Sequence, residues 1–209
     1  MNVHSLGLKV IVNKSVETRS RIISVAHNLF VNQGYHRTSM RQIAEKAGIA
    51  VGGIYNHFEN KESIFKEVFF EYHPYKELLP ILLESTNENI EQFIRDAAGH
   101  MVGVLHRRPD FLNLMFIEIV EFNNIHALDI IQNILPKGLE SIRARLHFRE
   151  KRLKQIPPVI LIRTFIGLFF SYYMTDIILG PGRKIEFEGN AMDYFVDIYL
   201  HGILSGEQS

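Results

Sequence analysis

The segment IAEKAGIAVGGIYNHFENKESIF, residues 43–65, holds residues suited to contact with a polyanion. It predicts two short helices with a glycine corner at Gly48, and the second helix opens on small, weak helix formers. Those residues are Ala50, Val51, Gly52 and Gly53. Small side chains at a helix start let the backbone approach a ligand, and the unbonded N–H groups there can face phosphate. Alternatively, the glycines only permit tight packing against a neighbouring helix, and the spacing leaves both interpretations open.

Three polar or aromatic side chains, Tyr55, Asn56 and His57, come just after these glycines. An asparagine that points into the major groove can pair bidentately with adenine. Two short helices joined by a glycine turn are typical of a helix-turn-helix, whose second helix enters the major groove of DNA. The segment is therefore typical of a helix that contacts a DNA duplex, and the packing interpretation stays open beside it.

The helices that must position this segment follow from hydrophobic periodicity. Residues 15–35 place five apolar side chains at the spacing of an amphipathic helix. These are Ile22, Val25, Ala26, Leu29 and Phe30. Ser39 and Gln42 have capping-box spacing, so they predict the start of a second helix that ends at Gly48. Asn60 is a suitable N-cap for a further helix.

Helical periodicity also dominates the rest of the chain, and strand signals are few. The fold class is therefore all-α, with an N-terminal three-helix helix-turn-helix domain and a larger helical domain behind it. The later helices are expected over about 50–58, 60–73, 87–106, 109–122, 125–149 with a kink at Pro136, 157–179 and 191–204, with a loop over 180–190. We divide the chain into a flexible arm (1–16), the helix-turn-helix domain (17–64) and the helical domain (65–209).

Composition limits the class of protein. The 209 residues are 46% hydrophobic, enough for a sizeable core, and the absence of cysteine excludes disulfides and thiolate metal sites. Net charge is zero, yet residues 1–65 carry eight Lys or Arg against four Glu. A basic N-terminal segment followed by an acidic remainder of the chain favours a polyanionic partner, although a surplus of this size is common in N-terminal segments. The first residues do not form a signal peptide, and a cytoplasmic setting fits.

The stretch PPVILIRTFIGLFFSYYMTDIILG, residues 157–180, is about long enough to span a membrane. Arg163 and Asp176 lie inside it, and each costs about 2.5–3.5 kcal/mol at a helix centre in lipid. We therefore expect no membrane contact, and expect this helix to be buried in a core or against another subunit.

Residues 17–65 resemble the DNA-binding domain of the TetR family of bacterial transcriptional regulators. Many positions match the family pattern at fixed spacing without a gap, over about a quarter of the chain. They are Phe30, Gly34-Tyr35, Thr38-Ser39, Ile43-Ala44, Ala47-Gly48-Ile49, Gly52-Gly53-Ile54-Tyr55-Asn56-His57-Phe58 and Lys61-Glu62. The long helices behind this domain match the family only in size and character.

The resemblance implies DNA contacts residue by residue. It implies phosphate contacts for Thr38 and Lys61 and backbone contacts for Tyr55 and His57. The full set of implied DNA-contacting residues is Thr38, Ser39, Arg41, Ala50, Val51, Gly52, Gly53, Tyr55, Asn56, His57 and Lys61. The sequence departs from the family at Val51, where Lys or Arg is frequent, and at Gly53, where Thr or Ala is frequent. Base reading should then rely on thymine methyl contacts, Tyr55 and Asn56.

The resemblance further implies a homodimer formed through the last two long helices and a small-molecule effector whose binding releases DNA. The apolar side chains of the middle helices predict that this effector is mostly hydrophobic. The candidate effector-site residues are Met101, Leu105, Met115, Glu118, Phe122, His126, Arg163, Phe169 and Tyr173. Side chains of this kind are also typical of plain core. Glu118 and Arg163 lie in apolar stretches where a bare charge is costly, so they pair with one another, meet a ligand or reach solvent.

Other classes of protein are less well supported. The sequence lacks a nucleophile elbow, a phosphate loop, a dinucleotide fingerprint and a zinc-helix motif, so we expect no catalytic residue, no cofactor and no metal site. A helical interaction protein without DNA binding is the alternative. We expect a transcriptional regulator, by family default a repressor, that binds a two-fold symmetric double-stranded DNA operator.

Overall fold

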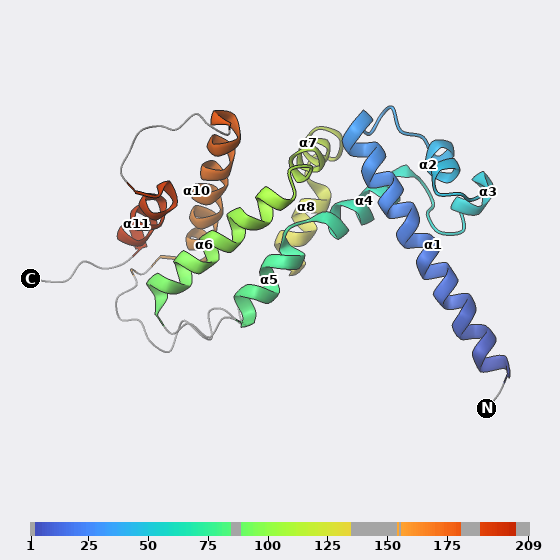
Figure 1. Ribbon diagram of the computed structural model, residues 1–209, viewed down its shortest axis with the longest axis horizontal. Helices are drawn as coiled ribbons and strands as arrows, with labels where there is room; N and C mark the ends of the chain where they lie inside the picture. Colours follow the sequence, from blue (N-terminus) through green and yellow to red (C-terminus); the bar gives the residue numbers. More distant parts are fainter. Residues whose placement is uncertain (1–2, 85–88, 135–153, 155, 181–188, 204–209) are drawn as a thin grey trace, which may run out of the picture. The chain divides into compact units, whose positions relative to one another are not determined.

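The structure, a computed structural model, describes residues 3–84, 89–134, 154, 156–180 and 189–203. These residues form helices and contain no strand (Figure 1), which confirms the all-α prediction.

The chain divides into two compact units. The first combines Met1–His73 with Asp110–Ile130, and the second combines Pro74–Pro109 with Ile131–Ser209. The units therefore do not follow the sequence-based division at residue 64, because the segment around 110–130 groups with the helix-turn-helix.

The first unit holds α1 (Val3–Gln33), α2 (Met40–Lys46), α3 (Val51–Ile54), α4 (Lys61–Tyr72), α7 (Phe111–Phe122) and α8 (Ile125–Asp129). Helix α1 packs against α2, α4 and α7, and α4 packs against α8. Both predicted caps are present. The Gln42 N–H donates to Ser39 Oγ, the Ser39 N–H donates to Gln42 Oε1, and the Ser63 N–H donates to Asn60 Oδ1 at 2.8 Å. These caps fix where α2 and α4 begin.

Two features of this unit differ from the sequence-based expectations. Residues 3–16, expected to be a flexible arm, are helical and form the first turns of α1, because no proline interrupts the chain there and helix propagation adds one hydrogen bond per residue; their flexibility stays a prediction. The third helix is also shorter than expected. Regular α3 ends at Ile54, and the chain continues as a hydrogen-bonded turn in which the His57 and Phe58 N–H groups donate to the Ile54 carbonyl. The low helix propensity of Gly52 and Gly53 accounts for this.

An aromatic core explains why α7 belongs to the first unit. The Phe122 ring of α7 lies 4.6 Å from Phe65 of α4 and 5.0 Å from Tyr35, measured between ring centroids. Phe30 of α1 lies 5.6 Å from Phe65. Such ring pairs add to the free energy gained by burying their area. One side of α7 thus completes the core of the helix-turn-helix.

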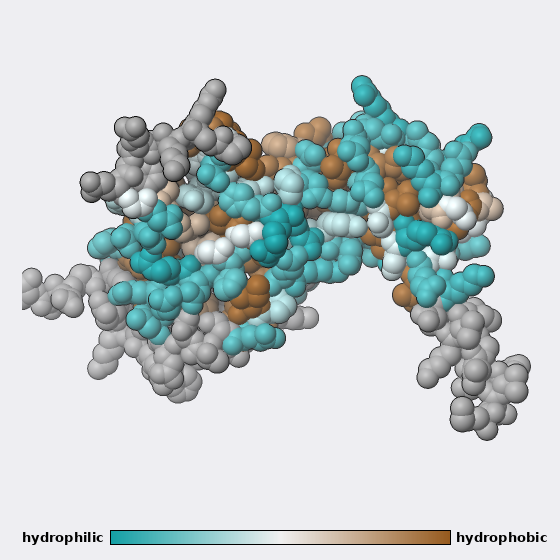
Figure 2. All heavy atoms as spheres, in the orientation of Figure 1, coloured by the Kyte–Doolittle hydropathy of each residue, from teal (hydrophilic) through white to brown (hydrophobic). Residues whose placement is uncertain are grey.

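The outer side of α7 is also apolar. Phe116, Ile119 and Val120 are exposed there, and Figure 2 shows hydrophobic residues at the surface over this helix.

The second unit holds α5 (Tyr75–Glu84), α6 (Ile90–Arg107), α10 (Pro158–Leu179) and α11 (Ala191–Ile203), and a π-helical turn η1 (Ile130–Ile134) follows α8. The predictions of α6, α10 and α11 are confirmed. Helix α5 was not predicted, because Pro80 inside it indicates a helix break. The predicted kink at Pro136 and most of the predicted loop over 180–190 lie outside the described residues.

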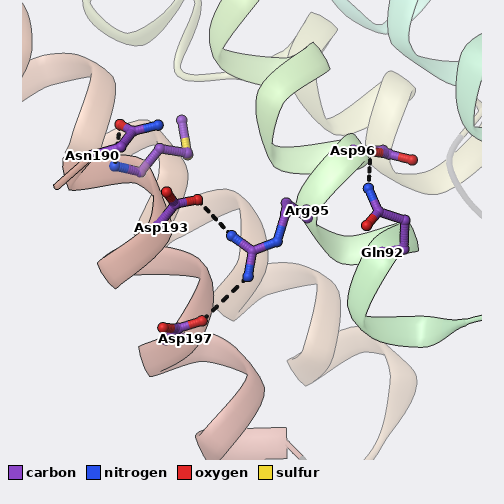
Figure 3. Close-up of polar contacts among 7 residues, drawn as sticks. Gln92, Arg95, Asp96, Asn190, Asp193 and Asp197 are labelled. Atoms are coloured by element: carbon purple, nitrogen blue, oxygen red, sulfur yellow. Dashed lines mark hydrogen bonds and ion pairs between the residues drawn. The ribbon is translucent and has the colours of Figure 1, made fainter.

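Helices α6, α10 and α11 pack against one another in the second unit. An arginine fork joins two of them, because Arg95 of α6 contacts Asp193 at 2.5 Å and Asp197 at 3.4 Å, both on α11 (Figure 3). The Tyr199 hydroxyl of α11 donates to the Leu161 carbonyl of α10 at 2.7 Å. These contacts fix α11 relative to both neighbours.

Helix α10 is apolar on nearly all sides yet little covered. Its segment Val159–Leu179 is apolar enough and long enough to cross a membrane, by length and composition only. In the 18-residue window of this segment that meets this criterion, 11% is buried. Length and composition alone do not distinguish such a span from a helix that packs against another subunit. The exposed apolar side chains on α10 and α11 are Val159, Ile160, Ile166, Ile177, Ile178, Tyr194 and Ile198.

Candidate nucleic-acid interface

The corner between α2 and α3 gives the site its shape. Gly48 has φ +66°, a left-handed conformation that glycine adopts without strain, and it turns the chain directly after α2. Ile54 is fully buried and anchors α3 on the core, so the rest of α3 faces outward. Val51, Gly52, Tyr55 and Asn56 are exposed.

The two glycines of α3 are not packing residues. A Cβ added at Gly52 or Gly53 would meet no atom within 4 Å, so neither position needs glycine for close contact with another described residue. The packing interpretation is therefore wrong. Small side chains at these positions leave an open backbone surface on the exposed side of α3. Helix α3 has only four residues, so it presents this surface to the solvent rather than a helix dipole.

The hydroxyl groups of Thr38 and Ser39 make hydrogen bonds within the first unit. The Thr38 side chain is buried, its hydroxyl donates to the Gly34 carbonyl at 2.9 Å, and Gln33 Nε2 donates to it at 3.2 Å. The expected phosphate contact by this side chain therefore has no exposed group to make it. Ser39 is exposed, and its hydroxyl caps α2.

Lys61 is engaged inside the unit. Its Nζ donates to the backbone carbonyls of Tyr35 and Thr38, at 2.8 Å each, and lies 4.1 Å from the centroid of the Tyr35 ring. Burial lowers the pKa of Lys61, and the nearby Glu121 carboxylate opposes that shift. The structure thus gives Lys61 a role in holding the α1–α2 corner, and its predicted phosphate contact stays a prediction.

Two other basic residues are also paired. Arg41 Nε lies 2.8 Å from Glu45 Oε1, and this hydrogen bond raises the pKa of Arg41. Arg19 pairs with Glu67 at 2.9 Å and lies over the Phe58 ring.

Arg37 and Lys46, by contrast, are exposed and make no side-chain ion pair with another residue in the part of the chain that the structure describes. Lys46 was absent from the sequence-based site. The i,i+4 spacing of Arg41 and Glu45 could have indicated that Arg41 is partly neutralised and that Lys46 is the unpaired cation of α2.

His57 is half-buried and Tyr55 is 54% exposed, so the pair implied to contact the DNA backbone reaches the surface through Tyr55 above all. Asn56 is exposed beside Tyr55. These positions permit the expected contacts, which stay predictions.

The expected effector-site residues fall into both units. Four of them are buried in the second unit, namely Met101, Leu105, Phe169 and Tyr173, and Arg163 of that unit is exposed. The other four belong to the first unit, namely Met115, Glu118, Phe122 and His126.

Glu118 is fully buried. Its carboxylate accepts hydrogen bonds from the His126 N–H at 2.7 Å and the Ala127 N–H at 3.0 Å, and lies 2.8 Å from His126 Nδ1. Of the alternatives left open for Glu118, none predicted this histidine partner.

Comparison with known proteins identifies the family. Residues 22–68 match the family model "Bacterial regulatory proteins, tetR family". The HTH-type transcriptional regulator AcrR of Shigella flexneri is 45% identical over 53 residues, which is 25% of each chain. The "Probable acrEF/envCD operon repressor" of Escherichia coli K12 is 33% identical over 148 residues, covering 68% of this chain and 62% of that one. The matches thus span less than two thirds of either relative.

A solved structure extends the likeness of the fold. The crystal structure of a tetR family transcription regulator from Shewanella sp. PV-4 aligns with a TM-score of 0.68 and 18% identity, covering 90% of this chain and 99% of that one. The fold agrees over nearly the whole chain, and the sequence agrees over the helix-turn-helix. The chain is a member of the TetR family of bacterial regulatory proteins.

Proposed function

We propose that this protein is a cytoplasmic, ligand-responsive transcriptional repressor that binds a two-fold symmetric operator as a homodimer. The observation that carries the proposal is the exposed, glycine-opened surface of α3, which belongs to a helix-turn-helix matching the family model. One relative is named an operon repressor. Relatives named as transcription regulators also argue against an enzyme.

One experiment tests the proposal most directly. The purified full-length protein is used to select bound fragments from random duplex DNA. Recovery of an inverted repeat would support both DNA binding and a homodimer, because two-fold symmetry in the protein is mirrored in its operator. Recovery of no sequence at low ionic strength would favour the helical interaction protein instead.

We expect uncharged side chains to recognise the bases of the operator. Val51 can contact a thymine methyl group, and Asn56 can pair with adenine through N6 and N7. Tyr55 adds an exposed phenol beside them. Since α3 carries no Lys or Arg, phosphate contacts would come from residues outside this helix.

Arg37 and Lys46 are expected to supply part of that phosphate attraction. Arg37→Gln and Lys46→Gln should each weaken binding to all duplexes alike. Each should also make the negative slope of log affinity against log salt concentration shallower by about 0.9, the value for one phosphate neutralised. Fluorescence anisotropy over a salt series measures the slope. Arg19→Gln is the control, because Arg19 is already paired with Glu67. An unchanged slope in both test variants would exclude these contacts.

Gly52→Ala is expected to separate stability from DNA binding. Alanine gains about 1 kcal/mol of helix propensity over glycine, and the added methyl meets no atom of the described chain, so the free energy of unfolding should rise. The same methyl would stand between α3 and the duplex, so operator affinity should fall. Thermal unfolding and anisotropy measure the two effects.

The matched control for that variant is Gly99→Ala on α6, where an added Cβ also meets nothing within 4 Å. It should gain stability and leave operator affinity unchanged. If Gly52→Ala bound the operator as tightly as the control variant, close backbone approach at α3 would be excluded.

The second unit would supply the dimer contact. The apolar side chains that α10 and α11 leave exposed favour burial against a second copy, since burial contributes about 25 cal/mol per Å² of apolar surface. Arg95 of α6 holds α11 through Asp193 and Asp197 (Figure 3), and the Tyr199 hydroxyl of α11 donates to the Leu161 carbonyl of α10, so the exposed apolar side chains lie on two helices that are joined to one another. The exposed face therefore supports the proposed pairing through the last two long helices.

The effector would bind in the second unit. It would act on DNA binding by shifting the population from a state that binds the operator to a state that does not. Buried Met101 and Leu105 of α6 and Phe169 and Tyr173 of α10 favour a mostly hydrophobic ligand. A ligand shifts an equilibrium only by its difference in affinity for the two states, so release of most operator requires several kcal/mol of discrimination. A thermal-shift screen of lipophilic compounds tests for such a ligand.

A further inference from the structure

The outward face of α2 carries charges of both signs. Its exposed side chains are those of Arg41, Gln42, Glu45 and Lys46, whereas the opposite face is buried where α2 packs against α1 and α3. The first helix of a helix-turn-helix crosses the DNA backbone. An anion on the outward face of α2 would therefore lie beside phosphates in a complex with DNA, and Glu45 is such an anion.

Glu45 is paired with the arginine that lies one turn before it on α2. Arg41 Nε donates to Glu45 Oε1 at 2.8 Å, and the two side chains are 76% and 56% exposed. This hydrogen bond, together with the charge of Glu45, raises the pKa of Arg41, so the guanidinium group stays charged. Because the pair is open to the solvent, a phosphate that approaches α2 competes directly with the Glu45 carboxylate for the same cation.

A second pair of arginine and glutamate in the same unit has different surroundings. Arg19 Nη2 of α1 lies 2.9 Å from Glu67 Oε1 of α4, and the Arg19 guanidinium also lies 4.8 Å from the centroid of the Phe58 ring. In the described part of the chain, by contrast, Glu45 is the one side chain that pairs with Arg41. Removal of the carboxylate would therefore free Arg41, whereas Arg19 would still be held over an aromatic ring.

We propose that Glu45 competes with DNA for Arg41 and so limits the sequence-independent affinity of this protein for duplex DNA. The inference rests on the proposed function, DNA binding by the helix-turn-helix. Contacts with phosphate supply essentially all non-specific binding, so one free cation fewer lowers the affinity for random DNA. The uncharged side chains of α3 then contribute a larger share of the affinity for the operator.

The remaining N–H groups of the Arg41 side chain do not remove this competition. A guanidinium group has five N–H donors, and the hydrogen bond with Glu45 uses the one on Nε. A phosphate that approached the other donors would also approach the Glu45 carboxylate, and the two negative charges repel one another. Arg41 therefore contributes fully to DNA binding only when its ion pair with Glu45 is broken.

The test counts phosphate contacts through the salt dependence of binding. Fluorescence anisotropy follows the binding of a labelled random-sequence duplex to the full-length protein over a salt series. Glu45→Gln should raise the affinity and make the negative slope of log affinity against log salt concentration steeper by about 0.9, the value for one phosphate neutralised. The gain over the wild-type protein should therefore shrink about threefold between about 50 and about 200 mM salt.

Arg41→Gln assigns that gain to the freed arginine. In the wild-type background it should leave the slope unchanged, because Arg41 neutralises no phosphate while it is paired with Glu45. In the Glu45→Gln background it should remove the added slope of about 0.9, since the freed cation is then absent. Thermal unfolding followed by circular dichroism shows that each variant is folded at the temperature of the binding assay.

Glu67→Gln is the matched control, because it removes the same charge from the same unit and leaves Arg19 over the Phe58 ring. Its slope should equal that of the wild-type protein. An unchanged slope in Glu45→Gln, or an equal steepening in Glu67→Gln, would overturn the competition, because no cation would have been freed or net charge alone would explain the gain.

A shallower slope in Arg41→Gln alone would also overturn the competition, because Arg41 would then already neutralise a phosphate in the wild-type complex. Failure of the proposed function gives a different result. Wild-type protein that bound no duplex at low ionic strength would overturn DNA binding itself, and the competition with it, whereas the outcomes above overturn the competition alone.

Discussion

Replacing Glu118 with alanine is expected to lower the free energy of unfolding of the first unit by about 3–5 kcal/mol. The carboxylate is fully buried and accepts hydrogen bonds from two backbone N–H groups, those of His126 and Ala127. No side chain caps α8 at Asn124, so Glu118 of the preceding helix takes the place of that cap. Its removal would leave those N–H groups and the buried His126 ring without their acceptor.

Urea unfolding followed by far-UV circular dichroism measures the loss, and hydrogen exchange of α7 and α8 peptides assigns it to the first unit. Glu59→Ala is the control, because Glu59 is exposed and its replacement should change stability by about 0.5 kcal/mol at most. Replacing Glu118 and His126 together by leucine should cost less than Glu118→Ala, since no buried polar partner remains. Equal stability of Glu118→Ala and Glu59→Ala would show that the buried pair contributes nothing.

Glu118 also shows where prediction from sequence ends. A glutamate in an apolar stretch signals a paired or functional group, and that much is visible in the sequence. Its partner was not identified, because the chain returns to it only after the left-handed residues Asn123 and Asn124. Arg163, the other charge in an apolar stretch, is exposed instead. Periodicity does not distinguish these outcomes, since they depend on which faces meet in the folded unit.

Local signals were predicted well, whereas contacts between residues distant in the chain were not. The capping box at Ser39, the N-cap at Asn60 and the corner at Gly48 rest on contacts within a few residues, and the structure confirms them. Helix α5 was missed because tertiary packing on α6 tolerates Pro80, which local rules treat as a break. The role of Lys61 was missed because its acceptors lie 26 and 23 residues away in the chain.

Lys61→Met is expected to lower the free energy of unfolding of the first unit by about 1.5–3 kcal/mol, the range for hydrogen bonds to a charged group. Methionine keeps much of the apolar stem but cannot donate to the Tyr35 and Thr38 carbonyls, nor place a cation over the Tyr35 ring. The corner before α2 would then lose its link to α4. Urea unfolding measures the loss, and Lys66→Met, which changes an exposed lysine on the same helix, is the control.

The same variant decides between the two roles of Lys61. If the ammonium group only holds the corner, the slope of log affinity against log salt concentration should be unchanged at temperatures well below unfolding. If it neutralises a phosphate, the negative slope should become shallower by about 0.9. Since three N–H donors are present and two already point at carbonyls, a third is available to DNA at most. A lost slope with unchanged stability would therefore contradict the structural role, because the carbonyl contacts would then carry no free energy.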